Sequence, residues 1–169
     1  MPSVKPSGGC ACGKIRYQLN REPMLTHCCH CKWCQRETGS AFVINTLIEA
    51  SEVELLGDLP ELVLTPSESG RGQLVARCPA CRVAVWSHYS AGEVISFIRV
   101  GTLDDPNLYP PDVHIFTNSK QAWVDLPETA TSFPEFYNSR EFWSPEVMSR
   151  WRAAVATPRK PDTEKPAHR

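Results

Sequence analysis

The cysteines of this chain stand in groups whose spacing suits metal binding. There are eight of them, and four fall within residues 28–34. Seven form three close-spaced motifs, a C-x-C, a C-x-C-x-x-C and a C-x-x-C: Cys10, Cys12, Cys29, Cys31, Cys34, Cys78 and Cys81. Sulfur ligands at such spacings are typical of zinc sites. The sequence therefore predicts two Zn²⁺ ions per chain, bound in two different ways.

The two cysteine pairs predict a structural zinc site. Zinc takes four ligands in a tetrahedron, and structural sites are commonly all cysteine. Cys10 and Cys12 supply two sulfurs from one turn, and Cys78 and Cys81 supply two from another. A metal held between them would tie an early loop to a late one. The alternative is a set of free buried thiols, for which the paired spacing would be a coincidence.

The three remaining cysteines of the motifs predict a catalytic zinc site. Cys29, Cys31 and Cys34 fill three positions and leave the fourth to water or substrate. Three thiolates around Zn²⁺ give the site a net charge of about −1, which weakens the metal as a Lewis acid. Such a centre is better suited to binding and activating a sulfur ligand than to generating hydroxide from bound water. Soft thiolates also prefer zinc to magnesium or manganese.

Residues between and beside these three cysteines have alternative roles. Cys28 is an alternative fourth ligand, which would make the site closed and structural. Adjacent residues of an extended chain point to opposite sides, however, so Cys28 and Cys29 do not easily share a metal. By the same alternation His30 faces away from the metal, either as an ordinary histidine or in contact with substrate. Arg36 is the nearest candidate to hold a substrate carboxylate.

Other polar and aromatic residues have mainly packing roles. We interpret His27 as structural and Trp33 as either a packing residue or part of a pocket wall. His114 and Lys120 can reach a site at a sheet edge, but residues of these types more often serve as surface or packing residues. Four aromatic side chains are assigned to the core: Trp86, Phe97, Phe116 and Trp123.

Composition favours a soluble, cytoplasmic domain. A chain of 169 residues makes one domain or one domain with a tail. A formal net charge of −1 gives no general attraction to nucleic acid or anionic membrane. The sequence has neither the apolar run of about 20 residues that a membrane span needs nor the apolar core of a signal peptide. In a reducing compartment close-spaced cysteines bind metal more often than they form disulfides; a secreted disulfide framework is the alternative.

The cysteines must be positioned by many short elements, because fifteen prolines and nine glycines leave little room for long ones. Alternating and β-branched residues predict strands at 14–19, 23–28, 41–48, 53–56, 61–65, 73–77, 83–88, 94–100 and 113–117. Residues 31–38 form a turn or one short helix. Gly13 follows the first cysteine pair and can take the positive φ that such a turn needs. The fold class is therefore mainly β, either sandwich-like or a folded-over sheet.

The chain changes character after Leu126. Ser144 and Pro145 suit the N-cap and first position of a helix, and Val147, Trp151 and Val155 recur every four residues. They predict a helix near 145–156 within an extension of residues 127–156. This helix packs on the domain or on a second subunit, so a homodimer is possible. Residues 157–169 are charged, rich in proline and expected to be disordered.

Several motifs together resemble one known family. The segments GGCACGKIRY, HCCHCKWCQRETGS, RCPAC and HIFTNSKQAWVDL resemble the glutathione-dependent formaldehyde-activating enzyme (GFA) family, which includes centromere protein V, over residues 8–126. The resemblance implies a folded β-sheet domain of the Mss4-like type with zinc knuckles. It implies a structural zinc on Cys10, Cys12, Cys78 and Cys81 and a second zinc on Cys29, Cys31 and Cys34. The family often has Gly where this chain has Arg82.

The resemblance also implies a function. We expect a zinc-dependent carbon–sulfur lyase, similar to S-hydroxymethylglutathione synthase, that acts on the glutathione or other thiol adduct of a small electrophile or metabolite. Glutathione is the expected co-substrate, and no nucleic acid or membrane partner is expected. The alternative is a non-catalytic zinc-stabilised binding module of the centromere protein V type, although the short tail of mixed charge lacks a strongly basic extension. A zinc-bearing chaperone or exchange-factor partner would rest on fold analogy alone.

Overall fold

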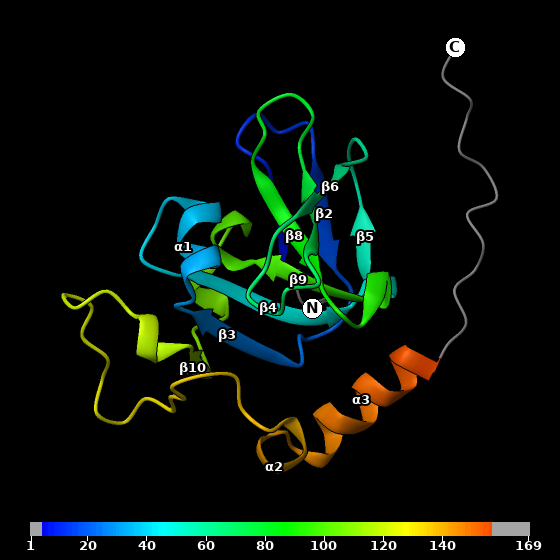
Figure 1. Cartoon of the computed structure of the whole chain (residues 1–169). Helices are drawn as coiled ribbons and strands as arrows, with labels where there is room; N and C mark the ends of the chain where they lie inside the picture. The colour runs from blue at the N-terminus through cyan, green and yellow to red at the C-terminus, as the bar shows by residue number, and fades with distance from the viewer. Residues whose placement is uncertain (1–4, 157–169) are drawn as a thin grey trace.

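The computed structural model describes residues 5–156, which form two β-sheets and three α-helices (Figure 1). The expected disordered tail at 157–169 lies outside the described residues. The smaller sheet has the order β1-β2-β5, with β1 (Ser7–Gly9), β2 (Arg16–Leu19) and β5 (Val53–Leu55). Of the helices that the structure describes, none is long and apolar enough to cross a membrane.

The larger sheet has seven strands in the order β10-β3-β4-β9-β8-β7-β6. Their bounds are β3 (Leu25–Cys29), β4 (Val43–Glu49), β6 (Glu61–Thr65), β7 (Gln73–Arg77), β8 (Ala84–His88), β9 (Ile95–Arg99) and β10 (Val113–Ile115). All neighbours are antiparallel except β10, which pairs with β3 in parallel. The mainly β prediction is confirmed, and every expected strand is present with its ends within two residues.

The helices and turns connect these strands. They are α1 (Lys32–Thr38), α2 (Ser139–Phe142), α3 (Pro145–Ala156) and 3₁₀ turns at Ala50–Glu52, Gly92–Val94, Val100–Thr102, Pro106–Leu108 and Thr117–Ser119. The C-terminal helix is confirmed, whereas α2 and β1 were not expected. No strand was predicted at β1 because its sequence, Ser-Gly-Gly, has no apolar side chain. A Cβ on Gly8 would lie 2.5 Å from the carbonyl oxygen of Thr102, so glycine lets this strand approach closely.

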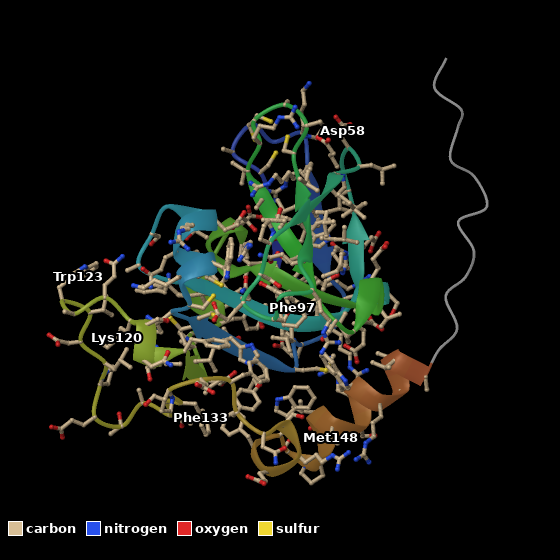
Figure 2. All side chains as sticks on the ribbon, viewed as in Figure 1. Asp58, Phe97, Lys120, Trp123, Phe133 and Met148 are labelled. Carbon is tan, nitrogen blue, oxygen red and sulfur yellow. The ribbon has the colours of Figure 1, made fainter. Side chains whose placement is uncertain are left out.

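The main core lies between the two sheets. The alternation of Ile15, Tyr17 and Leu19 predicted one buried face, and these side chains are at most 1% exposed. They pack against the larger sheet, where Trp86 meets Tyr17 edge-on with ring centroids 5.7 Å apart. Trp123, also expected in the core, is 72% exposed in a loop after β10 (Figure 2), so that prediction is wrong. Its indole nitrogen is satisfied locally by the side-chain oxygen of Gln121, at 2.7 Å.

The other face of the larger sheet is covered by the C-terminal extension. The helix α3 contacts β4 and β9 and lies along the lower edge of the sheet in Figure 1, so it packs on its own domain. Its contacts with the core come from Val147, Trp151 and Ala154. The four-residue spacing predicted Val155 on this face instead, but Val155 is 49% exposed. Spacings of four and then three follow the 3.6-residue turn more closely than two spacings of four.

An ion pair fastens α3 to the sheet. Arg150 donates to both carboxylate oxygens of Glu49, at 2.9 and 2.6 Å, and to the carbonyl oxygen of Glu22 at 2.9 Å. Only 9% and 12% of the Arg150 and Glu49 side chains are exposed. Burial alone would raise the pKa of Glu49, but the hydrogen bonds from Arg150 hold it below its ordinary value.

We expect Arg150→Ala to lower the free energy of unfolding by about 3 kcal/mol, because it leaves the buried Glu49 carboxylate with only its longer contact to the half-exposed Arg21, at 3.3 Å. Chemical denaturation measures this loss. Arg152→Ala is the matched control on the exposed side of the same helix, and should change stability by less than about 0.5 kcal/mol. Equal losses in the two variants would contradict this account.

Candidate metal centres

Two turns bring the four cysteines of the paired motifs together. Cys10 and Cys12 lie between β1 and β2, and Cys78 and Cys81 lie between β7 and β8. All four sulfurs lie within 4.8 Å of one another; those of Cys10 and Cys12 are 3.5 Å apart, and those of Cys12 and Cys78 3.6 Å. Zn–S bonds of about 2.3 Å at tetrahedral angles place two sulfurs about 3.8 Å apart. The cluster therefore fits zinc in both donor set and spacing.

Both turns end on a residue with left-handed backbone. Gly13 has a φ of 77° and Arg82 a φ of 64°. The Cys10 carbonyl accepts from the Gly13 amide at 3.1 Å, and the Cys78 carbonyl accepts from the Arg82 amide at 2.9 Å. The first turn therefore closes over three residues and the second over four, and each ends on a positive φ. A hydrogen bond from the backbone at Val83 lowers the pKa of Cys81 to about 6, which favours the thiolate form that binds metal.

Arg82 occupies its position at an energetic cost. A side chain in the left-handed region costs about 1–2 kcal/mol relative to ordinary backbone. The guanidinium of Arg82 donates to Glu61 at 2.6 Å, but both side chains are more than half exposed, so this contact contributes little. Because glycine would adopt this backbone without that cost, Arg82 is tolerated here rather than stabilising.

The second cluster is built where β3 passes into α1. Cys29 ends β3, Cys31 is the N-cap of α1, and Cys34 lies in its first turn. The Cys31 sulfur accepts from the Cys34 amide at 3.2 Å, and the Cys34 thiol contacts the Cys29 sulfur at 3.4 Å. The three sulfurs lie within 4.8 Å of one another and are 2–6% exposed. They can fill three positions of a tetrahedral metal.

These three thiols share their protons. Hydrogen bonds from Cys29 and Cys34 lower the pKa of Cys31 to about 3, and the same contacts together with burial raise the pKa of Cys29. The hydrogen bonds among the sulfurs therefore favour the thiolate form at Cys31 over Cys29. A divalent ion of the zinc class can replace the shared protons, because thiolates are its preferred ligands.

Arg99 lies near the three-cysteine cluster and was missed by the sequence analysis. It is 6% exposed and donates to Asn45 at 3.0 Å, to Glu37 at 3.0 Å and to Ser87 at 3.1 Å. Its positive charge favours the thiolate form of Cys34. No local spacing marks this residue, since the pairing of β4 with β9 brings it opposite Asn45.

A cavity of about 430 Å³ opens beside Arg99. Its polar and apolar walls come from α1, β4 and the turn after β7: Glu37, Phe42, Val43, Arg77, Arg82 and Arg99 among others. Val43 also packs against the three cysteines. Glu37 forms ion pairs with both Arg77 and Arg99, and Arg82 contacts Glu61, so three guanidinium groups face two carboxylates. The walls keep an excess of positive charge.

The two remaining catalytic candidates lie elsewhere. Arg36 borders a second cavity, of about 580 Å³, and its guanidinium lies 5.7 Å from the centre of the Trp33 ring. His30 faces away from the three cysteines and instead meets His114, with Nε2 3.1 Å from Nδ1, and Cys28, with Nε2 3.5 Å from the sulfur. Lys120, near His114 in the chain, donates to the carbonyl oxygen of Val124 at 2.5 Å.

The C-terminal extension borders the three-cysteine cluster. Tyr137 is buried and belongs to the same group of packed side chains, with Phe142 and Trp143 around it. The hydroxyl of Tyr137 accepts from the Trp143 indole at 2.7 Å and lies 2.5 Å from Nε2 of His27. Burial lowers the pKa of His27 to about 4, so this imidazole is neutral at pH 7. His27 therefore joins the extension to the strand that carries Cys29.

A comparison with family models agrees with the motifs. A family model described as glutathione-dependent formaldehyde-activating enzyme matches residues 5–119, which include both cysteine clusters. A crystal structure of a Rhodobacter sphaeroides protein is similar over 62% of this chain and 96% of that chain, with a TM-score of 0.47 and 17% identity. No curated protein matches the sequence. The extension at 127–156 lies beyond the matched residues.

We expect Arg82→Gly to raise the free energy of unfolding of the metal-loaded protein by about 1 kcal/mol, because glycine adopts positive φ without strain. Thermal or chemical unfolding measures the gain. Arg82→Ala is the control: it also loses the contact with Glu61 but keeps a Cβ in the left-handed region. If both variants change stability equally, backbone strain at Arg82 is not the cause.

Proposed function

We propose that this chain, which belongs to the family of glutathione-dependent formaldehyde-activating enzymes, is a zinc-dependent carbon–sulfur lyase. Its substrate is the adduct of glutathione, or a related thiol, with a small electrophile. The observation that carries the proposal is the convergence of three buried sulfurs from Cys29, Cys31 and Cys34. Among the described residues, no fourth cysteine, histidine or carboxylate completes this cluster within 4.8 Å. A tetrahedral ion held there would keep one position for the substrate.

The two cysteine clusters would hold zinc in two roles. The site of Cys10, Cys12, Cys78 and Cys81 would be structural, because four sulfurs leave no position for a substrate. When bound at the other site, zinc supplies a positive centre that favours the thiolate form of a sulfur ligand near neutral pH. The low exposure of the three sulfurs, 2–6%, keeps bulk water from competing for that position.

The proposed reaction needs no redox partner. In the cleavage direction the carbon–sulfur bond of the hydroxyalkyl adduct breaks and its electron pair stays on sulfur. The hydroxyl oxygen becomes the carbonyl oxygen of the released aldehyde, and the hydroxyl hydrogen ends on the released thiol. In the reverse direction the thiol adds to the aldehyde. The protein contributes by binding both fragments next to each other and by favouring the thiolate.

The positively charged cavity suits a substrate that carries carboxylates, as glutathione does. Arg77 and Arg82 border this cavity, and guanidinium groups bind carboxylates with two parallel hydrogen bonds. Arg99 holds Glu37, and Glu37 in turn orients Arg77. We therefore assign substrate binding to Arg77 and Arg82, and a positioning role to Arg99. Arg36, assigned to carboxylate binding from its place in the sequence, faces the other cavity.

The two clusters should respond differently to loss of one sulfur. We expect Cys31→Ala to lose one of two zinc ions per chain and carbon–sulfur lyase activity, while the fold survives. Cys78→Ala should unfold or aggregate, because metal bound at a structural site contributes folding free energy. Elemental analysis gives the zinc content, and circular dichroism reports the fold.

Two outcomes would change this view. Equal damage from both substitutions would contradict the division into structural and catalytic sites. A wild-type chain that holds both zinc ions but neither forms nor cleaves thiol adducts of aldehydes would favour a non-catalytic binding module of the centromere protein V type.

We expect Arg77→Met to raise KM for a glutathione adduct roughly tenfold or more with a smaller change in kcat, because a charge-assisted hydrogen bond contributes about 1.5–3 kcal/mol. Exchange between glutathione, formaldehyde and their adduct, followed by NMR, gives both constants. Arg71→Met is the control, since it removes a guanidinium from an exposed turn between β6 and β7. If KM rises equally in both variants, general electrostatic attraction is responsible rather than Arg77.

A further inference from the structure

A third group of metal-binding side chains lies on the opposite side of β3 from the three-cysteine cluster. It consists of Cys28, His30 and His114. The parallel pairing of β10 with β3 places His114 directly beside Cys28, and His30 follows two residues later. Alternation along the strand turns Cys28 and His30 away from Cys29. Cys28 and His30 are buried and His114 is half-buried, so the group is accessible from one side.

The distances within this group fit a tetrahedral ion. Bonds of about 2.05 Å to nitrogen and 2.3 Å to sulfur place two nitrogens about 3.3 Å apart, and a nitrogen and a sulfur about 3.6 Å apart. The observed separations are 3.1 Å from His30 Nε2 to His114 Nδ1 and 3.5 Å from His30 Nε2 to the Cys28 sulfur. All three ligand atoms lie within 4.8 Å of one another.

Hydrogen bonding accounts for these contacts less well. A ring nitrogen of a neutral imidazole carries either one hydrogen or one lone pair, so it makes one good hydrogen bond. Two polar atoms nevertheless lie around His30 Nε2, and its other ring nitrogen, Nδ1, is buried with no hydrogen-bond partner among the described residues. A single ion bound to Nε2, His114 Nδ1 and the Cys28 sulfur would satisfy all three atoms at once.

We propose that Cys28, His30 and His114 form a third metal site, for a divalent ion of the zinc class. One thiolate with two imidazoles is a donor set that suits zinc and excludes magnesium and calcium, which prefer oxygen ligands. The site goes beyond the proposed lyase function, since it shares no ligand with either cysteine cluster. Lys120, whose charge reaches His30, is engaged with the carbonyl oxygen of Val124.

The third site should bind more weakly than the other two. Metal on Nε2 of His30 puts the ring hydrogen on Nδ1, and a metal-bound histidine normally donates that hydrogen to an acceptor. Nδ1 of His30 has no such acceptor among the residues that the structure describes. The ion at this site should therefore be the first to leave on dialysis against a mild chelator.

The test uses the full chain with zinc in both cysteine-only sites, established beforehand by elemental analysis. Co²⁺ is then added, and its visible absorption reports tetrahedral binding to imidazole and thiolate. We expect the wild-type chain to take up one further equivalent without losing zinc. Cys28→Ala and His114→Asn should each weaken this uptake at least tenfold. Asparagine keeps a polar atom near the position of Nδ1, so His114→Asn preserves a hydrogen bond but loses the imidazole ligand.

Three results would overturn the proposal: no uptake beyond the two zinc ions, displacement of zinc instead of additional binding, or equal uptake by His114→Asn and the wild-type chain. Unfolding measurements on each variant exclude loss of the fold as the reason for lost uptake. The outcome is separate from that of the lyase proposal. A chain that holds two zinc ions and no third ion contradicts only the third site, whereas a chain without zinc on Cys29, Cys31 and Cys34 contradicts the lyase proposal.

Discussion

The alternation of side chains at the end of β3 is the constraint on which both groups of metal-binding side chains beside this strand depend. Successive residues of an extended chain point to opposite faces, so Cys29 and Cys31 turn toward Cys34 while Cys28 and His30 turn toward His114. Four adjacent residues thus supply ligand atoms to two separate groups. A shift of one residue in the pairing of β3 with β4 would exchange the two sides and separate both groups from their partners.

The positions of the strands and the grouping of the cysteines could be predicted because both depend on local pattern. Alternating residues such as Ile15, Tyr17 and Leu19 reveal a buried face, and close-spaced cysteines predict shared sites. β1 could not be predicted, since its two glycines carry no such pattern and its place depends on contact with Thr102. Arg99 was missed for a related reason: pairing between distant strands, rather than sequence spacing, brings it near Cys34.

α1 separates two cavities of different character. On one side Glu37 and Val43 border the cavity that contains Arg77 and Arg99, next to the three cysteines. On the other side Gln35 and Arg36 border an open cavity that is also lined by Phe42, Gln121 and Trp123. A helix of seven residues can border both cavities because its side chains point in different directions around the helix axis. Only Cys34 among them is buried. The same geometry explains why Arg36 does not face the side on which Arg77 lies.

The sulfur of Cys31 is both a proposed metal ligand and the group that caps α1 by accepting from the Cys34 amide. Electron density that the sulfur gives to a metal is withdrawn from this hydrogen bond, and returns to it when the ion departs. The nitrogen and hydrogen of the Cys34 amide therefore act as a built-in spectroscopic reporter of occupancy. Their NMR frequencies would follow filling of the site in the unmodified chain, without substitution of the metal or a label on the substrate.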